Sequence, residues 1–183
     1  MHGMHNILPK RITLAVCLLM IAAALGAQAQ QWKTYSYPAD GFSASFPSEP
    51  QISKRNVPTD AGSFELRAYL VEDGQAALYV GVCDYGSATA GRTPDTILQG
   101  AKQGAIDNVK AHLLREKRIT LGAYPGVEFE ADNDSMHFYA RIYIVGSTLY
   151  QTLIAAPLSG PYVSATTFLD SFQMIPRVSA ATP

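Results

Sequence analysis

A basic, then apolar, then small-residue leader opens the sequence and constrains everything that follows it. A basic pair precedes an apolar run at 12–25, and small residues at Ala27 and Ala29 close the segment. This order is typical of a secretory signal peptide, because the peptidase requires small side chains at those two positions. We therefore expect residues 1–29 to be a signal peptide that is cleaved after Ala29.

The apolar run is short for a permanent membrane anchor. The residues at 12–25 would rise about 21 Å as a helix, whereas the hydrocarbon core of a bilayer is about 30 Å thick. We therefore expect no stable membrane span after cleavage. The mature protein is expected to be periplasmic or secreted.

Cleavage leaves 154 of the 183 residues, which is the usual size of one domain. We expect a single domain at 30–176 and a flexible C-terminal tail at 177–183. Lys10 and Arg11 leave with the leader, so 12 basic and 15 acidic residues remain and the formal charge is −3. Such a charge gives no electrostatic footprint for nucleic acid, so no nucleic-acid partner is expected.

The mature chain keeps one cysteine, because Cys17 is lost with the leader. An intramolecular disulfide is therefore impossible, even in an oxidising compartment. Cys83 ends the apolar run 78–83, which favours a buried and inert thiol over a reactive one. Stability must come from the packing of the core.

The first half of the mature chain reads as short strands separated by turn residues. The segment 51–57 would be an edge strand that is stopped by Pro58. A three-residue loop at 72–74 would set Leu70 opposite Ala76 and leave Gly74 free to take a left-handed bulge position. The predicted strands are 32–37, 42–46, 51–57, 64–71 and 78–83.

A long helix is predicted at 94–114. Thr93 can cap its N-terminus, and Pro94 suits the first helical position. An apolar stripe repeats every fourth residue, while Lys102 falls on the polar side. We expect the stripe to pack on the sheet; it consists of Ile97, Ala101, Ala105, Val109 and Leu113, widened by Leu98 and Ile106.

The second half predicts a meander of four strands and then a short helix. The strands are 116–121, 127–131, 136–145 and 148–156. The helix begins at Gly160-Pro161, carries apolar residues at helical spacing and ends before Pro176. The predicted class is α+β: an antiparallel sheet of about six to nine strands, packed by one long and one short helix.

Register arguments gather polar and aromatic side chains on one face of this meander. A turn at 133–134 would set Glu130 opposite His137, and a turn at 146–147 would set Tyr143 opposite Tyr150. Aromatic residues around an arginine are usual anchors of recognition surfaces. The alternative is a solvent-exposed sheet face with compatible cross-strand pairs. We call this candidate binding patch the meander patch: Glu128, Glu130, His137, Tyr139, Arg141, Tyr143 and Tyr150.

Catalytic and metal chemistry find little support in the sequence. Only His112 and His137 remain after cleavage, and the mature chain has no nucleophile elbow, phosphate loop or paired-cysteine motif. The acidic run 130–134 lacks the spacing of a calcium loop, so a solvated turn is expected there. We therefore expect no catalytic residues, no metal and no cofactor.

Several segments together resemble the PsbP-like exported bacterial proteins. They are Gly41-Phe42-Ser43-Ala44-Ser45-Phe46-Pro47 with Pro50, Arg141-Ile142-Tyr143, Leu149-Tyr150-Gln151 and Phe168-Leu169-Asp170-Ser171-Phe172, with the long helix between. The resemblance covers most of 32–175 and implies an antiparallel sheet flanked by helices. It also implies an accessory or binding role rather than catalysis, but no site residues.

Three functions are carried forward. The first is a non-catalytic accessory protein that binds another envelope protein through the meander patch or its loops. The second is a carrier of a small lipophilic ligand, with a pocket between the long helix and the curved sheet. The third is an unrecognised hydrolase that uses Glu130 and His137.

Overall fold

The computed structural model describes residues 32–59, 62–74, 76–159, 162 and 164–178. The predicted signal peptide, with Ala27 and Ala29, lies outside these residues. The described residues form ten strands, two α-helices and the short 3-10 helix η2 (Gly86–Thr89), all within the unit that begins at Trp32. The predicted α+β class is confirmed.

Seven strands form the main antiparallel sheet, in the order β3-β4-β5-β9-β8-β7-β6. Each neighbouring pair except β5-β9 is a hairpin that follows directly along the chain. The strands are β3 (Gln51–Thr59), β4 (Gly62–Asp73), β5 (Ala76–Asp84), β6 (His112–Leu121), β7 (Tyr124–Asp132), β8 (Met136–Val145) and β9 (Thr148–Pro157). The predicted meander is present, and so is the predicted edge strand, although β3 continues through Pro58 to Thr59 instead of stopping at Pro58.

A second, smaller sheet has the order β1-β2-β10. Its strands are β1 (Lys33–Tyr37), β2 (Phe42–Phe46) and β10 (Gln173–Met174). Gly41, at φ +75°, allows the tight turn between the first two strands. The sequence analysis placed these N-terminal strands correctly but did not separate them from the main sheet.

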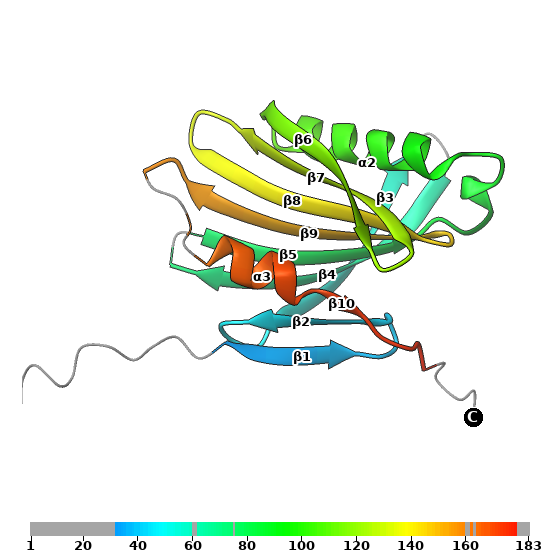
Figure 1. Cartoon of the computed structure of the whole chain (residues 1–183), viewed down its shortest axis with the longest axis horizontal. Helices are drawn as coiled ribbons and strands as arrows, with labels where there is room; N and C mark the ends of the chain where they lie inside the picture. The colour runs from blue at the N-terminus through cyan, green and yellow to red at the C-terminus, as the bar shows by residue number, and fades with distance from the viewer. Residues whose placement is uncertain (1–31, 60–61, 75, 160–161, 163, 179–183) are drawn as a thin grey trace, which may run out of the picture. The chain divides into compact units, whose positions relative to one another are not determined.

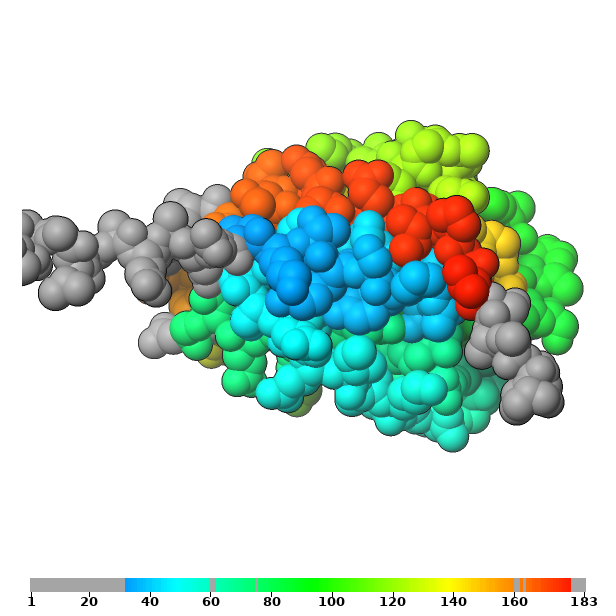
Figure 2. Space-filling view, turned by 90° about the horizontal axis from the view of Figure 1, so that it is seen from below, coloured from blue at the N-terminus to red at the C-terminus, as the bar shows by residue number. Residues whose placement is uncertain are grey.

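The two helices lie on opposite faces of the main sheet (Figure 1). Helix α2 (Pro94–Asn108) covers β7 and β8 on one face, and α3 (Ala165–Ser171) lies with the small sheet on the other. Figure 2 looks onto the small sheet, where β1 and β2 lie beside the C-terminal segment in red and orange. Two cores result, one on each side of the main sheet.

The first core joins the small sheet and α3 to the main sheet. Phe42, Phe46, Phe168 and Phe172 are almost completely buried in it. The Phe42 and Phe172 rings stack with centroids 5.6 Å apart. Burying each such ring stabilises the fold by about 1.5–3 kcal/mol.

The second core lies under α2. Leu98 and Ile106 of the helix pack on apolar residues of β7 and β8, including Phe129 and Ile142. Thr93 caps the helix, since its hydroxyl accepts a hydrogen bond from the Thr96 N–H at 3.2 Å. The predicted helix start is therefore confirmed.

The predicted helix end was wrong. The helix stops at Asn108, and the residues from His112 onward belong to β6. Lys110 takes a left-handed conformation at φ +52°, which ends the helix and redirects the chain. Leu113, expected in the buried stripe, is therefore 43% exposed on the edge strand.

The helix also faces the sheet at a different angle from the one predicted. Its fully buried positions are Leu98, Lys102 and Ile106, whereas Ile97 and Ala101 are half-buried. Lys102 was expected on the polar side, but its ammonium group forms an ion pair with Glu116 of β6. A buried lysine is tolerated because the carboxylate partner neutralises it.

The register of the β4-β5 hairpin was predicted incorrectly. Asp73 pairs with Ala76 and Leu70 pairs with Tyr79 instead of Ala76, so the register is shifted by three residues from the expected one. Tyr69 and Val71 therefore enter the first core, while Leu66 and Leu70 face the other side of the sheet. A register change by an odd number of residues exchanges the two faces of a strand.

The meander registers were predicted more successfully. The pair Tyr143–Tyr150 across the Gly146-Ser147 turn is confirmed. At the preceding turn, His137 pairs with Asp132 rather than Glu130, a slip of two residues that leaves every side chain on its expected face. The Asn133 carboxamide accepts hydrogen bonds from the N–H groups of Ser135 and Met136, which lengthens that turn.

The C-terminal segment is bound to the domain beyond the predicted boundary at residue 176. Arg177 donates hydrogen bonds to Thr148 and Tyr150, and the Val178 N–H donates to the Pro38 carbonyl. The rest of the predicted tail, and the Gly160-Pro161 start of the short helix, lie outside the described residues. None of the described helices has the length and apolarity needed to cross a membrane.

Candidate functional site

Helix α2 covers only part of its face of the main sheet. The two faces of the central strand β9 differ in burial. Tyr150 and Ile154 are completely buried in the first core, whereas Gln151 and Leu153 on the helix side are half-buried. The uncovered part of the face continues across β5, β4 and β3. The sheet and the flank of α2 therefore enclose an open groove.

The groove has a volume of about 910 Å³. This lies in the upper part of the range of about 300–1,000 Å³ that is usual for small-molecule sites. Its walls are α2 and the segment from Tyr85 to Arg92, and its floor is formed by four strands. The floor residues are Arg55, Val57, Pro58, Thr59, Leu66, Leu70, Ala77, Tyr79, Gly81, Cys83, Leu149, Gln151, Leu153 and Ala155.

Small residues of α2 give the groove its width. Gly100 and Gly104 line it, and the space around each Cα holds no other atom within 4 Å of where a Cβ would lie. Ala101 and Ala105 lie in the same wall. These small residues of the helix thus border a space that side chains do not fill.

The ring of Tyr79 lies against Gly81 on the floor. A Cβ added at Gly81 would approach Tyr79 Cζ to 2.8 Å, so only glycine leaves room for the ring. Burial raises the pKa of the Tyr79 hydroxyl, and the positive charge of Arg55 partly opposes that effect. The phenol therefore stays protonated at neutral pH and is available to donate a hydrogen bond.

Cys83 lies on the same floor and is 5% exposed. Burial raises the pKa of its thiol, which keeps it in the unreactive protonated form. The structure thus agrees with the buried, inert thiol expected from the sequence.

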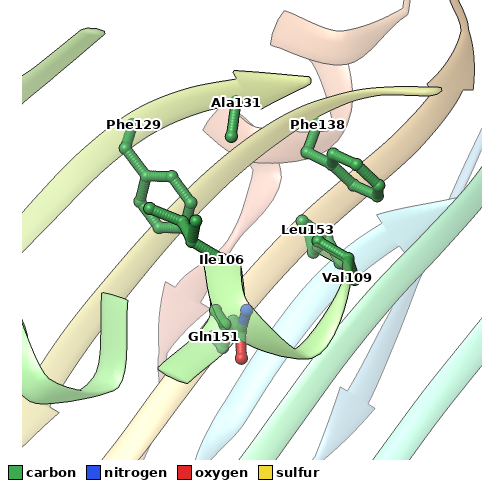
Figure 3. Close-up of a pocket in the computed structure, with 8 residues that line it drawn as sticks. Ile106, Val109, Phe129, Ala131, Phe138, Gln151 and Leu153 are labelled. Carbon is green, nitrogen blue, oxygen red and sulfur yellow. The ribbon is translucent and has the colours of Figure 1, made fainter. Parts of the chain in front are cut away.

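A small, partly open pocket lies beneath the C-terminal half of the helix (Figure 3). Its volume is about 20 Å³, room for about one water molecule, and Gln151 provides the polar side chain in its wall. It shares Ala105, Val109, Gln151 and Leu153 with the groove. Figure 3 shows its other lining residues, Ile106, Phe129, Ala131 and Phe138. The groove therefore borders the apolar core at this end.

The structure divides the predicted meander patch. Tyr143 and Tyr150 are 4% and 0% exposed, and both pack against Phe172 in the first core. The Tyr150 hydroxyl donates a hydrogen bond to the Asp40 carbonyl at 2.8 Å. These two tyrosines hold the layers together and do not form part of an exposed surface.

Three other members of the meander patch are tied into ion pairs. Arg141 Nε lies 2.6 Å from Glu128, and Arg141 Nη1 lies 2.7 Å from Asp170 of α3. Burial alone would raise the pKa of Glu128, but hydrogen bonds from Lys117 and Arg141 outweigh it, so the pKa lies below its ordinary value. Arg115 pairs with Glu130 in the same way. These charges are satisfied within the domain.

The remaining members, His137 and Tyr139, stack with ring centroids 4.3 Å apart. His137 Nε2 lies 3.4 Å from Glu130. His112 lies opposite Asp132 in the strand register, at the start of the edge strand β6. Among the described residues, no group of three or more potential metal ligands is brought together. In the acidic run, the Asn133 amide donates to the Val109 carbonyl at 2.9 Å, so this turn serves to hold the end of α2.

Sequence reasoning proposed a pocket between the long helix and the sheet but named none of its residues. Arg55 and Arg92 in particular passed unnoticed, because β3 and the segment before α2 read as an edge strand and a loop. The glycines and alanines at every fourth position of the helix were the available signal, since such a wall can border an open space as well as a close contact.

Comparisons with known proteins support the fold alone. The sequence matches no protein-family model and no curated protein. The structure is similar to the solution structure of cyanobacterial PsbP from Synechocystis sp. PCC 6803, with a TM-score of 0.57 and 14% sequence identity. The match covers 81% of this chain and 95% of that chain. The fold is therefore PsbP-like, as the sequence resemblance implied.

Proposed function

We propose that this chain is an exported, non-catalytic binding protein that holds an elongated apolar small molecule in the groove between α2 and the main sheet. The observation that carries the proposal is the open volume of about 910 Å³ beside a half-buried apolar floor. When a ligand covers half-buried apolar residues, the free energy falls by about 25 cal/mol for each Å² of apolar surface that is removed from water.

The exported location is part of the proposal and rests on the basic, apolar and small-residue leader at 1–29. A protein in the cell envelope meets lipids and other apolar molecules that need shielding from water. A carrier of such molecules needs a preformed cavity and no catalytic residues. The groove between α2 and the main sheet supplies such a cavity.

An accessory role in binding another envelope protein is the second proposal. Strand β3 (Gln51–Thr59) favours it, because this long edge strand is largely exposed and runs beside the groove. An extended segment of a partner could add to such an edge through main-chain hydrogen bonds. The meander patch gives this role less support, since Tyr143 and Tyr150 lie in the core.

Filling the groove tests the first proposal. Gly104→Phe places a ring in the open space beside the helix, where the backbone leaves room for it. We expect the mature protein to bind the neutral apolar dye N-phenyl-1-naphthylamine with increased fluorescence, and the variant to bind it at least about tenfold more weakly. Gln99→Phe is the matched control, because Gln99 is exposed on the same helix and lies outside the groove.

The two variants separate the outcomes. Equal dye binding by both variants and the wild type would place the apolar site elsewhere, and absence of dye binding by the wild type would remove the carrier proposal. A protein partner that is captured equally well by Gly104→Phe, and lost when β3 is altered, would favour the accessory role.

A further inference from the structure

The charged residues that line the groove are all positive. They are Arg55 on β3 and Arg92 just before α2, and no acidic residue is present among the lining residues. A groove that is otherwise apolar, with two guanidinium groups and no carboxylate, complements an anion with a long apolar body.

These two arginines differ from the other arginines of the domain. Within the described residues, neither makes an ion pair or a side-chain hydrogen bond, whereas every other arginine does. The partnered ones are Arg67 with Asp40, Arg115 with Glu130, Arg118 with Asp95, Arg141 with Glu128 and Asp170, and Arg177 with Thr148 and Tyr150. The guanidinium donors of Arg55 and Arg92 are thus available to a ligand.

Both arginines lie at the same end of the groove. Arg55 shares a cross-strand row with Leu66 of β4, Cys83 of β5 and Leu149 of β9. Strand β5 ends just after this row, and the chain continues through η2 to Arg92 and the start of α2. The Tyr79 ring lies over Gly81, the next residue along this face of β5, so the Tyr79 hydroxyl points from Tyr79 toward the end of the groove that holds Arg55.

The opposite end of the groove is uncharged and mainly apolar, with Asn108 as a polar lining residue at the end of α2. Its floor row contains Ala77 of β5 and Ala155 of β9, and Leu70 and Leu153 lie in the row beside it. Helix α2 also ends at this side of the groove. The Val109 carbonyl that follows the helix accepts a hydrogen bond from Asn133, which lies in the turn before β8, close to the row that Phe138 shares with Ala155. The groove therefore has one cationic end and one apolar end, with the wall of Gly100 and Gly104 between them.

We infer that the ligand is a single-chain amphiphile with a carboxylate headgroup, bound with the carboxylate at Arg55 and Arg92 and the acyl chain toward Ala77 and Ala155. This inference rests on the function proposed above and names the ligand class of the same site. Guanidinium groups bind carboxylates through charge-assisted, often bidentate hydrogen bonds. Residues of α2 and β9 then shield the chain from water.

A matched pair of ligands tests the headgroup. Palmitate and hexadecanol have the same chain length, and each is titrated against the mature protein with bound N-phenyl-1-naphthylamine. We expect palmitate to displace the dye at about tenfold or more lower concentration than hexadecanol. In Arg55→Gln/Arg92→Gln this preference should disappear through weaker palmitate binding, with hexadecanol unchanged.

Two control variants complete the test. Lys54→Gln removes a cation from the same strand, but from its other face, where Lys54 lies 3.8 Å from Glu65; its preference for palmitate should equal that of the wild type. Arg55→Lys/Arg92→Lys keeps the charge and should keep most of the preference. Thermal unfolding of each variant checks that it is folded.

The possible results distinguish the two proposals. Equal binding of palmitate and hexadecanol by the wild type, or an unchanged preference in Arg55→Gln/Arg92→Gln, would overturn the headgroup inference and leave the apolar groove standing. Failure of both ligands to displace the dye, together with Gly104→Phe behaving as wild type, would instead remove the proposed function.

Discussion

Arg67 Nη2 lies 2.6 Å from Asp40 Oδ1, and this ion pair connects the small sheet to the main sheet. Asp40 belongs to the turn between β1 and β2, and its side chain is 4% exposed, whereas Arg67 projects from β4. The Tyr69 hydroxyl donates a hydrogen bond to Oδ2, the other oxygen of the same carboxylate. A buried carboxylate in the β1-β2 turn thus holds two side chains of β4.

Asp40→Asn should destabilise the mature protein by about 2–4 kcal/mol. The substitution keeps the shape of the side chain but leaves the largely buried guanidinium of Arg67 with the exposed Glu65, at 3.7 Å, as its one acidic partner. Urea denaturation followed by circular dichroism measures the change. Asp134→Asn, in an exposed turn, is the control and should alter the free energy of unfolding by less than about 0.5 kcal/mol. Equal effects of the two substitutions would contradict this role of Asp40.

Lys102 and Glu116 should respond unequally to substitution. Glu116→Gln leaves a lysine whose side chain is 8% exposed without a counter-ion, and we expect a loss of about 1–3 kcal/mol. Lys102→Met should change stability by less than about 1 kcal/mol, since Glu116 is 39% exposed and can be hydrated. The same denaturation measurement compares the two variants. A larger loss of stability for Lys102→Met than for Glu116→Gln would contradict the expectation that the buried lysine depends more on its partner than the carboxylate does.

Asp84 provides a test of pH dependence. A hydrogen bond from the Ser147 hydroxyl, at 2.6 Å, and one from the Gly86 N–H lower the pKa of Asp84 below its ordinary value. A lowered pKa in the folded state means that this carboxylate stabilises the fold above its unfolded-state pKa, and that the contribution is lost as the pH falls through the folded-state pKa. Ser147→Ala should raise the pKa of Asp84, as measured by carboxyl NMR titration.

The result for Asp84 has a clear control. Ser135→Ala, in the exposed turn before β8, should leave the titration of Asp84 unchanged. An unchanged pKa in Ser147→Ala would mean that the Gly86 N–H alone is sufficient to hold the carboxylate.

Gly81→Ala should destabilise the domain by about 1 kcal/mol. The added methyl group would approach the Tyr79 ring too closely, and the ring would have to turn toward the groove. Tyr79→Ala should remove most of this penalty, which a double-mutant cycle measures as a coupling energy. Gly100→Ala is the matched control at an open helix position and should stabilise the protein by about 0.5–1 kcal/mol. Absence of coupling would mean that the ring does not rest on Gly81.

The sequence predicted elements well where the local signals agreed. Thr93 and Pro94 identified the start of α2, and Gly146-Ser147 set the register of β8 and β9. The end of α2 could not be found in this way, because the apolar spacing continued through Leu113 and Lys110 is an unusual residue for a left-handed position. The β4-β5 register failed because both faces of β4 carry apolar residues, one set for the core and one for the groove.

The candidate site was harder to predict than the fold. A row such as Arg55, Leu66 and Cys83 joins segments distant in sequence, and only strand pairing brings them together. The meander patch was assembled from correct faces, but the sequence did not indicate that the small sheet and α3 would cover Tyr143 and Tyr150. Long-range layering, rather than local pattern, decided which of these side chains meet solvent.

The alternation along β5 and β9 makes strand length a structural constraint. In each strand, neighbouring residues belong to different environments: Tyr150 and Thr152 face the first core, and Gln151 and Leu153 face the groove. Inserting one residue upstream in such a strand would exchange the two sets, bringing an amide into the aromatic interior and a tyrosine onto the groove floor. Homologous chains that keep this groove should therefore tolerate insertions in the loops between these strands but not within them.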